Sequence, residues 1–422
     1  MPLSLARKKQ SGNTWLSIIV RPPGGCYTSA HCVLTDAAGE ENVQMANQGG
    51  LEGIAVADIT TSFVDGSVGE LIYSGYKIED LAENATFEEA LFLLFHSRLP
   101  NRQEYEELRA TIAANAAIDE AVIRMLQSLP KATPGMAALR TAVSMLSAFD
   151  PDAENLLDKE VAARKALCLT GQIMTICAAW MRIIRGLEPI SPRGDLGVAQ
   201  NFLYMKSGEE PSATASAALD SYLVLLAEHG MNASTFAARV VTATGSDMHS
   251  AIVAGIGALK GPAHGGANSA AMNMFLEIGE VDNVLPWFEA NIKSGKRRIM
   301  GIGHRVYKAP DPRAAILKRQ AEALADSSGN RKWFDIAAKL ADAARADDYF
   351  IQRKLFPNVD YYSAIALYTL DLDVDMFTPL FALARIAGWS AHVIAQMSGR
   401  LIRPKANYVG PRGLTWLPMD ER

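Results

Sequence analysis

Apolar residues recur with helical spacing in one segment after another through most of the chain. Residues at i, i+3, i+4 and i+7 share one face of a helix, so such spacing predicts amphipathic or buried helices. The segments that fit this pattern are 104–116, 135–147, 161–184, 216–226, 248–259, 314–325, 333–346 and 377–395. The sequence therefore predicts a mainly α protein.

Local signals mark where some elements begin and turn. Thr86-Phe87-Glu88-Glu89 is a capping box ahead of the apolar run 90–95, and Asn101 can cap the next helix. Before these helices, two short β-like runs, 60–64 and 70–73, are separated by Asp65-Gly66-Ser67. That spacing predicts a small β-hairpin, a minor β element at the start of the folded part.

The best candidate for a membrane span is the stretch 166–181. It contains Gly171 and Gln172, stops at Arg182, and falls short of the roughly 20 apolar residues that a span needs. The pattern favours a fully buried core helix, and we expect no membrane partner.

Composition narrows the class of protein. The 422 residues amount to roughly three typical domains, which predicts two or three domains. Apolar residues make up 49% and charged residues 21%, as in ordinary globular proteins. Because 41 basic residues are outnumbered by 46 acidic ones, we expect no nucleic-acid partner. The four cysteines, Cys26, Cys32, Cys168 and Cys177, form no CxxC pair, so we expect a reducing, cytoplasmic location.

The first 35 residues contain Arg7, Lys8, Lys9 and Arg21 but no acidic residue. A basic, acid-free start is typical of a transit peptide, which would place the protein in an organelle matrix. The alternatives are a loose tail, or translated sequence ahead of a later start such as Met45. We favour a loose tail or a later start over a transit peptide.

Two histidines lie between glycines. His264 lies in Gly261-Pro262-Ala263-His264-Gly265-Gly266, and His304 ends Gly301-Ile302-Gly303-His304. Glycines let a ligand approach the backbone closely. His229 follows the apolar run 223–227 and precedes Gly230, so it is expected at the end of a helix. From the residues alone, a ligand site and a structural role are about equally favoured.

Common metal and nucleotide motifs are missing from the sequence. The histidine intervals match no zinc pattern, so we expect no metal site. Gly255-Ile256-Gly257 and Gly301-Ile302-Gly303 lack the third glycine and the preceding strand of a dinucleotide-binding turn.

Charged residues in unusual settings suggest an anion site. Asp311-Pro312-Arg313 reads as a helix start, which places Arg313 where an anion would bind well. Arg385 is the only charged residue between Met376 and Gln396, so it needs an internal or a ligand carboxylate as partner. Asp360 follows Phe356-Pro357-Asn358-Val359. It could act as a base with a raised pKa or merely cap a helix over 361–370.

Together these motifs resemble the citrate synthase family from about Gly50 to the end, with residues 1–48 outside the resemblance. Small departures are Ile302, where an aromatic residue is usual, and Ser269, where glutamate is common; both leave the substrate open. The motifs that carry the resemblance are His229-Gly230-Met231-Asn232-Ala233-Ser234, Gly261-Pro262-Ala263-His264-Gly265-Gly266-Ala267-Asn268, Gly301-Ile302-Gly303-His304-Arg305-Val306-Tyr307-Lys308, Asp311-Pro312-Arg313, Phe356-Pro357-Asn358-Val359-Asp360, Phe381-Ala382-Leu383-Ala384-Arg385 and Arg403-Pro404-Lys405.

The resemblance implies an almost all-α homodimer with a large domain, residues 49–264 and 366–422, and a small mobile domain, residues 265–365. It implies an acyltransferase that condenses acetyl-CoA with oxaloacetate and hydrolyses citryl-CoA to citrate and CoA. This is the entry step of the tricarboxylic acid cycle. Acetyl-CoA is then a co-substrate, and no tightly bound cofactor is expected.

The resemblance also assigns roles to residues. Asp360 would remove a proton from the acyl-CoA, His264 would stabilise the enol, and His304 would polarise the ketone of oxaloacetate. Arg403 would serve the active site of the other subunit. The oxaloacetate-binding residues would be His229, Arg313, Arg385 and Arg403, and the CoA-binding residues Met300, Gly301, Ile302, Gly303 and Lys308.

Two alternatives accompany this interpretation. 2-Methylcitrate synthase uses propionyl-CoA with the same catalytic groups, and one methylene gives only about 1–3 kcal/mol of discrimination. We favour citrate because Asn358-Val359-Asp360 and His229-Gly230-Met231-Asn232 look more like that branch. A non-catalytic helical binding protein on the same fold is the remote alternative; the joint presence of the expected catalytic and arginine residues argues against it.

Overall fold

The structure is a computed structural model that describes residues 4–10, 13–19, 29–33, 50–51, 53–155 and 158–422. The chain divides into two compact units, Met1–Asp58 and Ile59–Arg422, which are described separately below. Cys26 and Met45, on which two of the sequence-based expectations fall, lie outside the described residues.

The first unit contains an antiparallel sheet in the order β1-β2-β3. Residue Lys8 pairs with Trp15 in the first ladder, and Ser17 pairs with His31 in the second. A loose tail does not describe the three strands of this segment, whereas the alternative of translated sequence ahead of a later start stays a prediction. The strands are β1 (Ser4–Gln10), β2 (Asn13–Ile19) and β3 (Ser29–Val33).

The second unit begins with the predicted hairpin. Strands β4 and β5 pair antiparallel, with Ser62 opposite Tyr73 and Asp65 opposite Glu70, and a short β6 follows β5. Gly69, at the turn, has φ +79°, a conformation that a side chain would strain. The hairpin prediction is confirmed. The strands are β4 (Ser62–Asp65), β5 (Glu70–Tyr73) and β6 (Tyr76–Lys77).

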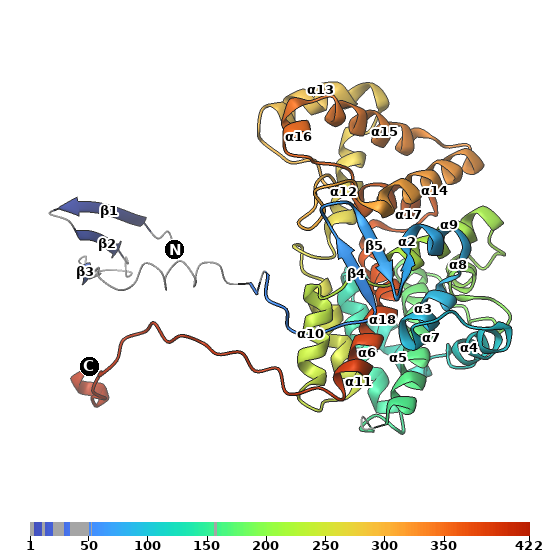
Figure 1. Ribbon diagram of the computed structural model, residues 1–422, viewed down its shortest axis with the longest axis horizontal. Helices are drawn as coiled ribbons and strands as arrows, with labels where there is room; N and C mark the ends of the chain where they lie inside the picture. The colour runs from blue at the N-terminus through green and yellow to red at the C-terminus, as the bar shows by residue number, and fades with distance from the viewer. Residues whose placement is uncertain (1–3, 11–12, 20–28, 34–49, 52, 156–157) are drawn as a thin grey trace. The chain divides into compact units, whose positions relative to one another are not determined.

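Helices form the rest of the second unit, which confirms the mainly α prediction (Figure 1). Short 3₁₀ or π turns occur at Ser147–Phe149, Val281–Asn283, Glu289–Lys293, Val374–Met376 and Met419–Glu421. The α-helices are α2 (Ile78–Asn84), α3 (Phe87–His96), α4 (Arg102–Ala114), α5 (Glu120–Ser128), α6 (Gly135–Leu146), α7 (Lys159–Ile184), α8 (Val198–Ser207), α9 (Ala213–Leu226), α10 (Ala233–Thr242), α11 (Met248–Leu259), α12 (Ala267–Ile278), α13 (Val284–Phe288), α14 (Pro312–Ser328), α15 (Lys332–Arg345), α16 (Asp348–Gln352), α17 (Val359–Thr369) and α18 (Phe377–Gln396).

The predicted helix starts are found where the sequence put them. Thr86 and Glu89 form the reciprocal capping box of α3, and Asn101 forms a second one with Glu104 at α4. Because each box satisfies two free backbone N–H groups, both helices begin at these residues. Every segment with helical apolar spacing is a helix, with ends shifted by a few residues.

The core is centred on α18, of which most residues are buried. It packs against α7, α9, α10 and α11. Helix α7 is, within the described residues, the one helix long and apolar enough to cross a membrane, and 72% of its apolar window is buried inside the protein. In Figure 1, α13, α15 and α16 lie at one end of this unit and α6 and α11 at the other.

One glycine of α18 lies where backbone and side chains leave no room. A Cβ on Gly388 would come 2.2 Å from Oε2 of Glu228 and 2.5 Å from the Ala227 carbonyl. The Gly388 N–H donates to that same carbonyl at 3.1 Å. This close approach sets how tightly α18 packs on the end of α9.

We therefore expect Gly388→Ala to lower the free energy of unfolding by about 1–3 kcal/mol, the usual cost of overpacking a core. Urea unfolding followed by circular dichroism measures the change. Gly194→Ala is the matched control, because a Cβ there meets nothing within 4 Å. Equal unfolding midpoints for the two variants would show that α18 can shift to make room.

Candidate active site

The loop that carries His304 is tied to the loop that precedes Asp360. The Gly303 N–H donates to the Phe356 carbonyl at 2.8 Å, and the Asn358 N–H donates to the Gly301 carbonyl at 2.9 Å. Asn358 Nδ2 also donates to the Gly303 carbonyl at 2.7 Å. Two of the three sequence motifs that contain expected catalytic residues therefore lie side by side.

His304 is held in one tautomer by the backbone that follows it. Its Nδ1 accepts the N–H groups of Val306 at 3.0 Å and Tyr307 at 3.1 Å. An Nδ1 that accepts cannot carry a hydrogen, so the neutral ring bears its hydrogen on Nε2. Burial and the Arg313 charge lower the pKa of His304 to about 4. The ring is thus neutral at pH 7 and donates through Nε2.

His229 lies just past the end of α9, as its position before Gly230 predicted. Its Nε2 is 3.2 Å from the Tyr307 hydroxyl, and its ring centroid is 5.8 Å from that of His304. Burial and the charges of Arg313 and Arg385 lower the pKa of His229 well below its usual range. This second histidine is therefore also neutral.

His264 belongs to the same cluster through α18. Its Nε2 lies 2.8 Å from Oγ of Ser234, and its ring meets Phe381 edge-on with centroids 6.2 Å apart. The guanidinium of Arg385 lies over the same Phe381 ring at 4.9 Å. Burial, with Arg385 as a second cause, lowers the pKa of His264 to about 4.

Arg313 stands in the first turn of α14, where Asp311 caps the helix and Pro312 follows, as predicted. Its Nε and Nη2 donate to the two carboxylate oxygens of Asp311 at 2.9 and 2.8 Å. Asp311 also accepts the Val359 N–H at 3.2 Å. The ion pair is buried, and it joins the start of α14 to the start of α17.

Arg385 has no comparable ion pair. Its side chain is 2% exposed, and its Nε donates to the Leu226 carbonyl at 2.7 Å. Among the described residues no carboxylate oxygen lies within 4 Å of its guanidinium nitrogens, although Glu228 is near enough to act on its pKa. The prediction that Arg385 is a buried cation is confirmed, and its remaining donors are available to an anion.

Glu228 is fully buried beside His229 and is held by several donors. One of its oxygens, Oε1, accepts from Ser62 Oγ at 2.9 Å, from the Gly230 N–H at 2.8 Å and from His392 Nε2 at 2.9 Å. Behind it, Arg239 donates to His392 Nδ1 at 3.2 Å. Hydrogen bonds and the nearby charges hold the pKa of Glu228 below its usual value despite burial.

Asp360 is the second residue of α17, and the structure decides between the two sequence-based readings of its local role. The helix cap is Asn358, whose Oδ1 accepts the Asp360 N–H at 2.9 Å. Asp360 is therefore not the cap, and its carboxylate is free for another task. Burial raises its pKa to about 6, against the opposing charges of Arg313 and Arg385.

Other expected site residues lie at the surface of this chain. Lys308 and Met300 are exposed, whereas Gly301 is buried and Ile302 forms an isolated antiparallel β-bridge with Pro357. Arg403 is exposed on a stretch without helix or strand. Within the described residues no three His, Cys, Asp or Glu side chains group as a metal site.

Sequence reasoning assigned no role to several residues that support the site. Tyr307 and Ser234 contact the ring nitrogens of His229 and His264, and Glu228 lies behind His229. The available signal was adjacency, because Tyr307 and Ser234 stand in the same motifs as the histidines and Glu228 precedes one. Their partners could not be inferred without the fold.

A separate cavity of about 420 Å³ lies between α3, α4, α8 and α9. Two carboxylates that line it, the buried Glu88 and the half-buried Asp220, cap helices, since Glu88 accepts the Val198 N–H at 2.8 Å and Asp220 the Phe87 N–H at 3.2 Å. Burial and the charge of Glu88 raise the pKa of Asp220 to about 8. Helix capping accounts for both carboxylates, and the cavity contains none of the expected site residues.

The raised pKa of Asp360 has a consequence for stability. Because the folded protein binds this proton more tightly than the unfolded chain, the contribution to stability is complete below about pH 4 and is lost as pH rises through 6. Asn mimics the protonated acid. Asp360→Asn should therefore be more stable than the parent at pH 8, by at most about 3 kcal/mol, and equal to it below pH 4.

Chemical unfolding over pH 4–8 measures this difference. Asp371→Asn is a control of opposite sign, since Arg185 and Lys206 hold the pKa of Asp371 below its usual value. That variant should lose stability at pH 7 and approach the parent in acid. Curves for Asp360→Asn and its parent that run parallel over the whole range would contradict the raised pKa.

The chain is similar in sequence to enzymes of known activity. The family model "Citrate synthase, C-terminal domain" matches residues 50–405. The chain is 46% identical to citrate synthase 2 of Bacillus subtilis, over 88% of this chain and 98% of that protein. It is 40% identical to a 2-methylcitrate synthase of Mycobacterium tuberculosis, over 86% of this chain and 90% of that protein.

A solved structure agrees in fold as well as in sequence. This chain is similar to the citrate synthase of Thermoplasma acidophilum, solved as a ternary complex with carboxymethyl coenzyme A and oxaloacetate. It superposes with a TM-score of 0.82 at 35% identity, covering 88% of this chain and 98% of that one. With these matches over most of its length, the chain belongs to the citrate synthase family.

Proposed function

We propose that this protein condenses acetyl-CoA with oxaloacetate and hydrolyses citryl-CoA to citrate and CoA. The observation that carries the proposal is Asp360, a buried carboxylic acid at the start of α17 whose pKa is raised to about 6, near neutral pH. A general base works best with such a pKa, because it is ionised yet still basic. Family membership and the 46% identity to a citrate synthase support the same reaction.

Proton removal from acetyl-CoA needs a base and an acid at once. Asp360 would take the α-proton while His264 hydrogen-bonds the thioester oxygen and stabilises the enol. Because Nε2 of His264 lies against Ser234, its Nδ1 is the atom left for the substrate. For Nδ1 to donate, Ser234 must donate its hydroxyl hydrogen to Nε2, turning it away from Asn232 Oδ1, 2.7 Å distant.

Oxaloacetate would bind between the two other histidines and the arginines. His304 would donate its Nε2 hydrogen to the ketone, making that carbon more electrophilic. Arg385, which has donors to spare, would hold one carboxylate, and Arg313 and His229 would contact the substrate beside it. A substrate carboxylate would then be the anionic partner of Arg385, a choice that the sequence left open between a ligand and an internal group.

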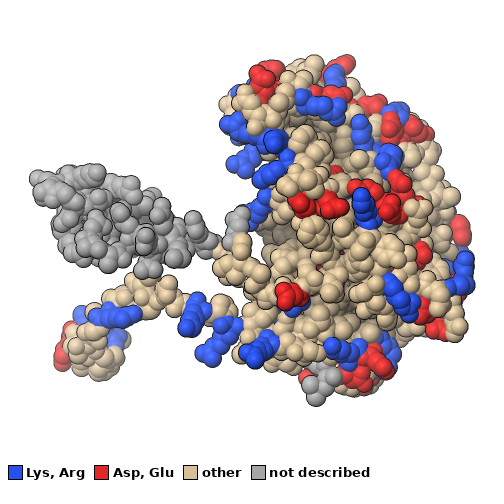
Figure 2. Space-filling view, viewed as in Figure 1, with Lys and Arg blue, Asp and Glu red and all other residues tan. Residues whose placement is uncertain are grey.

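Coenzyme A would lie along the 300–303 loop. Figure 2 shows Lys and Arg side chains gathered at the edge of the lobe that contains α13 and α16. The exposed cations near the loop are Lys296, Arg298, Arg305 and Lys308, which suit the phosphates of this co-substrate. The complex of the Thermoplasma relative with carboxymethyl coenzyme A and oxaloacetate supports both substrates.

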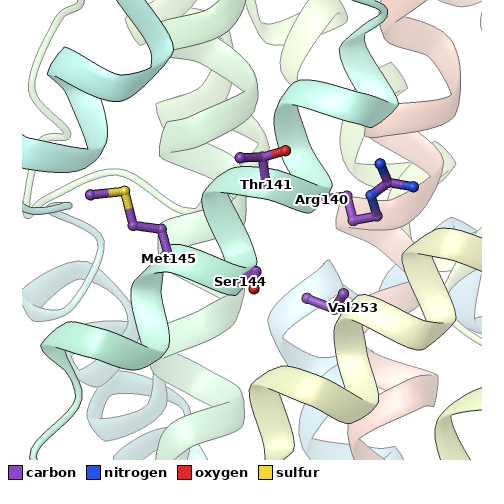
Figure 3. A pocket seen from close by; sticks show the side chains of 5 residues that line it. All are labelled: Arg140, Thr141, Ser144, Met145 and Val253. Carbon is purple, nitrogen blue, oxygen red and sulfur yellow. The ribbon is translucent and has the colours of Figure 1, made fainter.

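We further propose that the chain works as a homodimer and that Arg403 completes the site of the other subunit. Helix α11 leaves Val253, Ala254 and Ala258 partly uncovered, although its residues 251–259 are all apolar. With Arg140 and Met145 of α6, Val253 lines a hollow of about 390 Å³, shown in Figure 3. An apolar face of this kind suits a second copy, and the exposed Arg403 suits a partner's site.

Two other assignments rest on the sequence, the first on the family resemblance and the second on the cysteine content and the N-terminal composition. We propose that residues 265–365 form a small domain that closes over bound oxaloacetate and excludes water from the enol. We also propose a cytoplasmic location, with an organelle matrix as the alternative if the N-terminal segment is a transit peptide. Propionyl-CoA remains the alternative acyl substrate, because the mycobacterial relative at 40% identity is a 2-methylcitrate synthase.

The direct test is a steady-state assay of thiol release with oxaloacetate and either acetyl-CoA or propionyl-CoA. We expect the higher kcat/KM with acetyl-CoA. Asp360→Asn should lower turnover at least roughly a hundredfold while calorimetry still detects oxaloacetate binding. Asp371→Asn, at the surface, should keep normal turnover. Near-normal turnover of Asp360→Asn would reject Asp360 as the base, and a higher kcat/KM for propionyl-CoA would favour the alternative substrate.

The shared site can be tested by mixing two inactive variants, Arg403→Ala and Asp360→Asn, under conditions that exchange subunits. If Arg403 acts in the partner's site, each hybrid dimer contains one intact site and one with both lesions. Activity should then return to about half the parent level per hybrid, provided the sites act independently. Exchange confirmed by mass spectrometry without any return of activity would place Arg403 in the site of its own chain.

A further inference from the structure

The tip of the β4–β5 hairpin is closed against the segment that follows His304. The Gly66 carbonyl accepts the N–H groups of Lys308 at 2.7 Å and Ala309 at 3.3 Å. A Cβ on Gly66 would come 2.2 Å from the Val306 carbonyl oxygen, and one on Gly69 would come 2.5 Å from the Pro310 carbonyl oxygen. The hairpin turn and residues 306–310 therefore touch backbone to backbone.

The segment that contacts the hairpin tip also hydrogen-bonds to His304. The N–H groups that hold Nδ1 of the ring belong to Val306 and Tyr307, within the same short segment that the hairpin tip touches. If that segment moves, the two donors move with it, and the ring loses the contacts that fix its tautomer. The position of Gly66 therefore affects which ring nitrogen of His304 carries the hydrogen.

The base of the same hairpin holds the backbone on both sides of His229. Ser62 and Tyr73 are opposite each other in the β4–β5 ladder. Ser62 Oγ accepts the Gly230 N–H at 3.0 Å and donates to Glu228 at 2.9 Å. The Tyr73 hydroxyl donates to the Glu228 carbonyl at 2.8 Å and accepts the Glu228 N–H at 3.1 Å.

We propose that the β4–β5 hairpin is a positioning element that sets the spacing between His229 and His304. Its base fixes His229, its tip fixes His304, and four paired positions of one antiparallel ladder connect the two ends. A paired ladder is stiffer than a loop, so the 5.8 Å separation of the two rings is set by one rigid piece. The importance of this spacing for oxaloacetate rests on the proposed function; the spacing itself does not.

Three variants test the tip of the hairpin, its base and an exposed control position in turn. Gly66→Ala introduces the clash at the tip without straining the backbone, because Gly66 has no positive φ. Tyr73→Phe removes the hydroxyl at the base. Val68→Ala is the matched control, since Val68 is 68% exposed on the same turn.

The readout is ¹⁵N NMR of histidine-labelled protein, which distinguishes Nδ1–H from Nε2–H rings. Gly66→Ala should change the His304 signals and leave those of His264 in place. Tyr73→Phe should change the His229 signals, and Val68→Ala should change none. For both end variants we expect kcat/KM for oxaloacetate to fall roughly a hundredfold, the scale of a 1 Å misplacement.

If Gly66→Ala does not fold, Asp65→Ala replaces it. Asp65 Oδ1 accepts the N–H of Ser67 at 2.8 Å and its hydroxyl at 2.6 Å, so its loss loosens the turn without a clash. The His304 signals should then shift in the same direction by a smaller amount. Folded tip variants with unchanged His304 signals would refute the proposal. Because the NMR readout needs no substrate, altered signals in a chain that forms no citrate would support the positioning role and reject the proposed function instead.

Discussion

A guanidinium in the centre of an apolar helix has to be neutralised by its surroundings, and the region around Arg385 is arranged for that purpose. An unpaired buried charge costs several kcal/mol, so partners must be supplied by neighbouring elements. The end of α9 supplies a carbonyl and the nearby charge of Glu228, while α18 itself supplies the Phe381 ring. The bonds to Glu228 come from the hairpin, from α18 and from the turn after His229.

The burial of charged groups in this region also shifts the pKa values of the nearby histidines and of Asp360. Burial, aided by the charges of the buried arginines, favours the neutral form of the histidines, and burial also favours the protonated form of Asp360. A site with uncharged imidazole donors and a carboxylic acid that ionises near pH 6 follows from these placements. The two arginines that add to the neutral state of the histidines are also the groups that would hold a dicarboxylate, and they oppose the effect of burial on Asp360.

The sequence predicted much of the fold and less of the site. Apolar spacing located the long helices because periodicity is a local signal, and Thr86 and Asn101 marked two starts in the same way. The N-terminal strands escaped prediction because nothing in their local pattern distinguishes them from a tail. Asp360 stayed ambiguous until Asn358 was found to cap α17.

Roles in the site came from the family motifs, whereas the supporting contacts needed the fold. Ser62 and Tyr73 lie 166 and 155 positions from Glu228, a separation over which no local pattern carries information. The contact of Gly66 with residues 306–309 spans a longer separation still. Such pairings are a property of topology, and a helical periodicity cannot reveal them.

During synthesis the base and the tip of the hairpin meet their partner segments at different times. The ribosome makes β4 and β5 long before the segment that their turn must meet, and long-range contacts form slowly because loop closure costs entropy. During that interval the turn has no partner on its 306–310 side, whereas its base can already close on the end of α9. The His229 half of the site can therefore assemble while the chain is still growing, and the His304 half must wait for the last third of the protein.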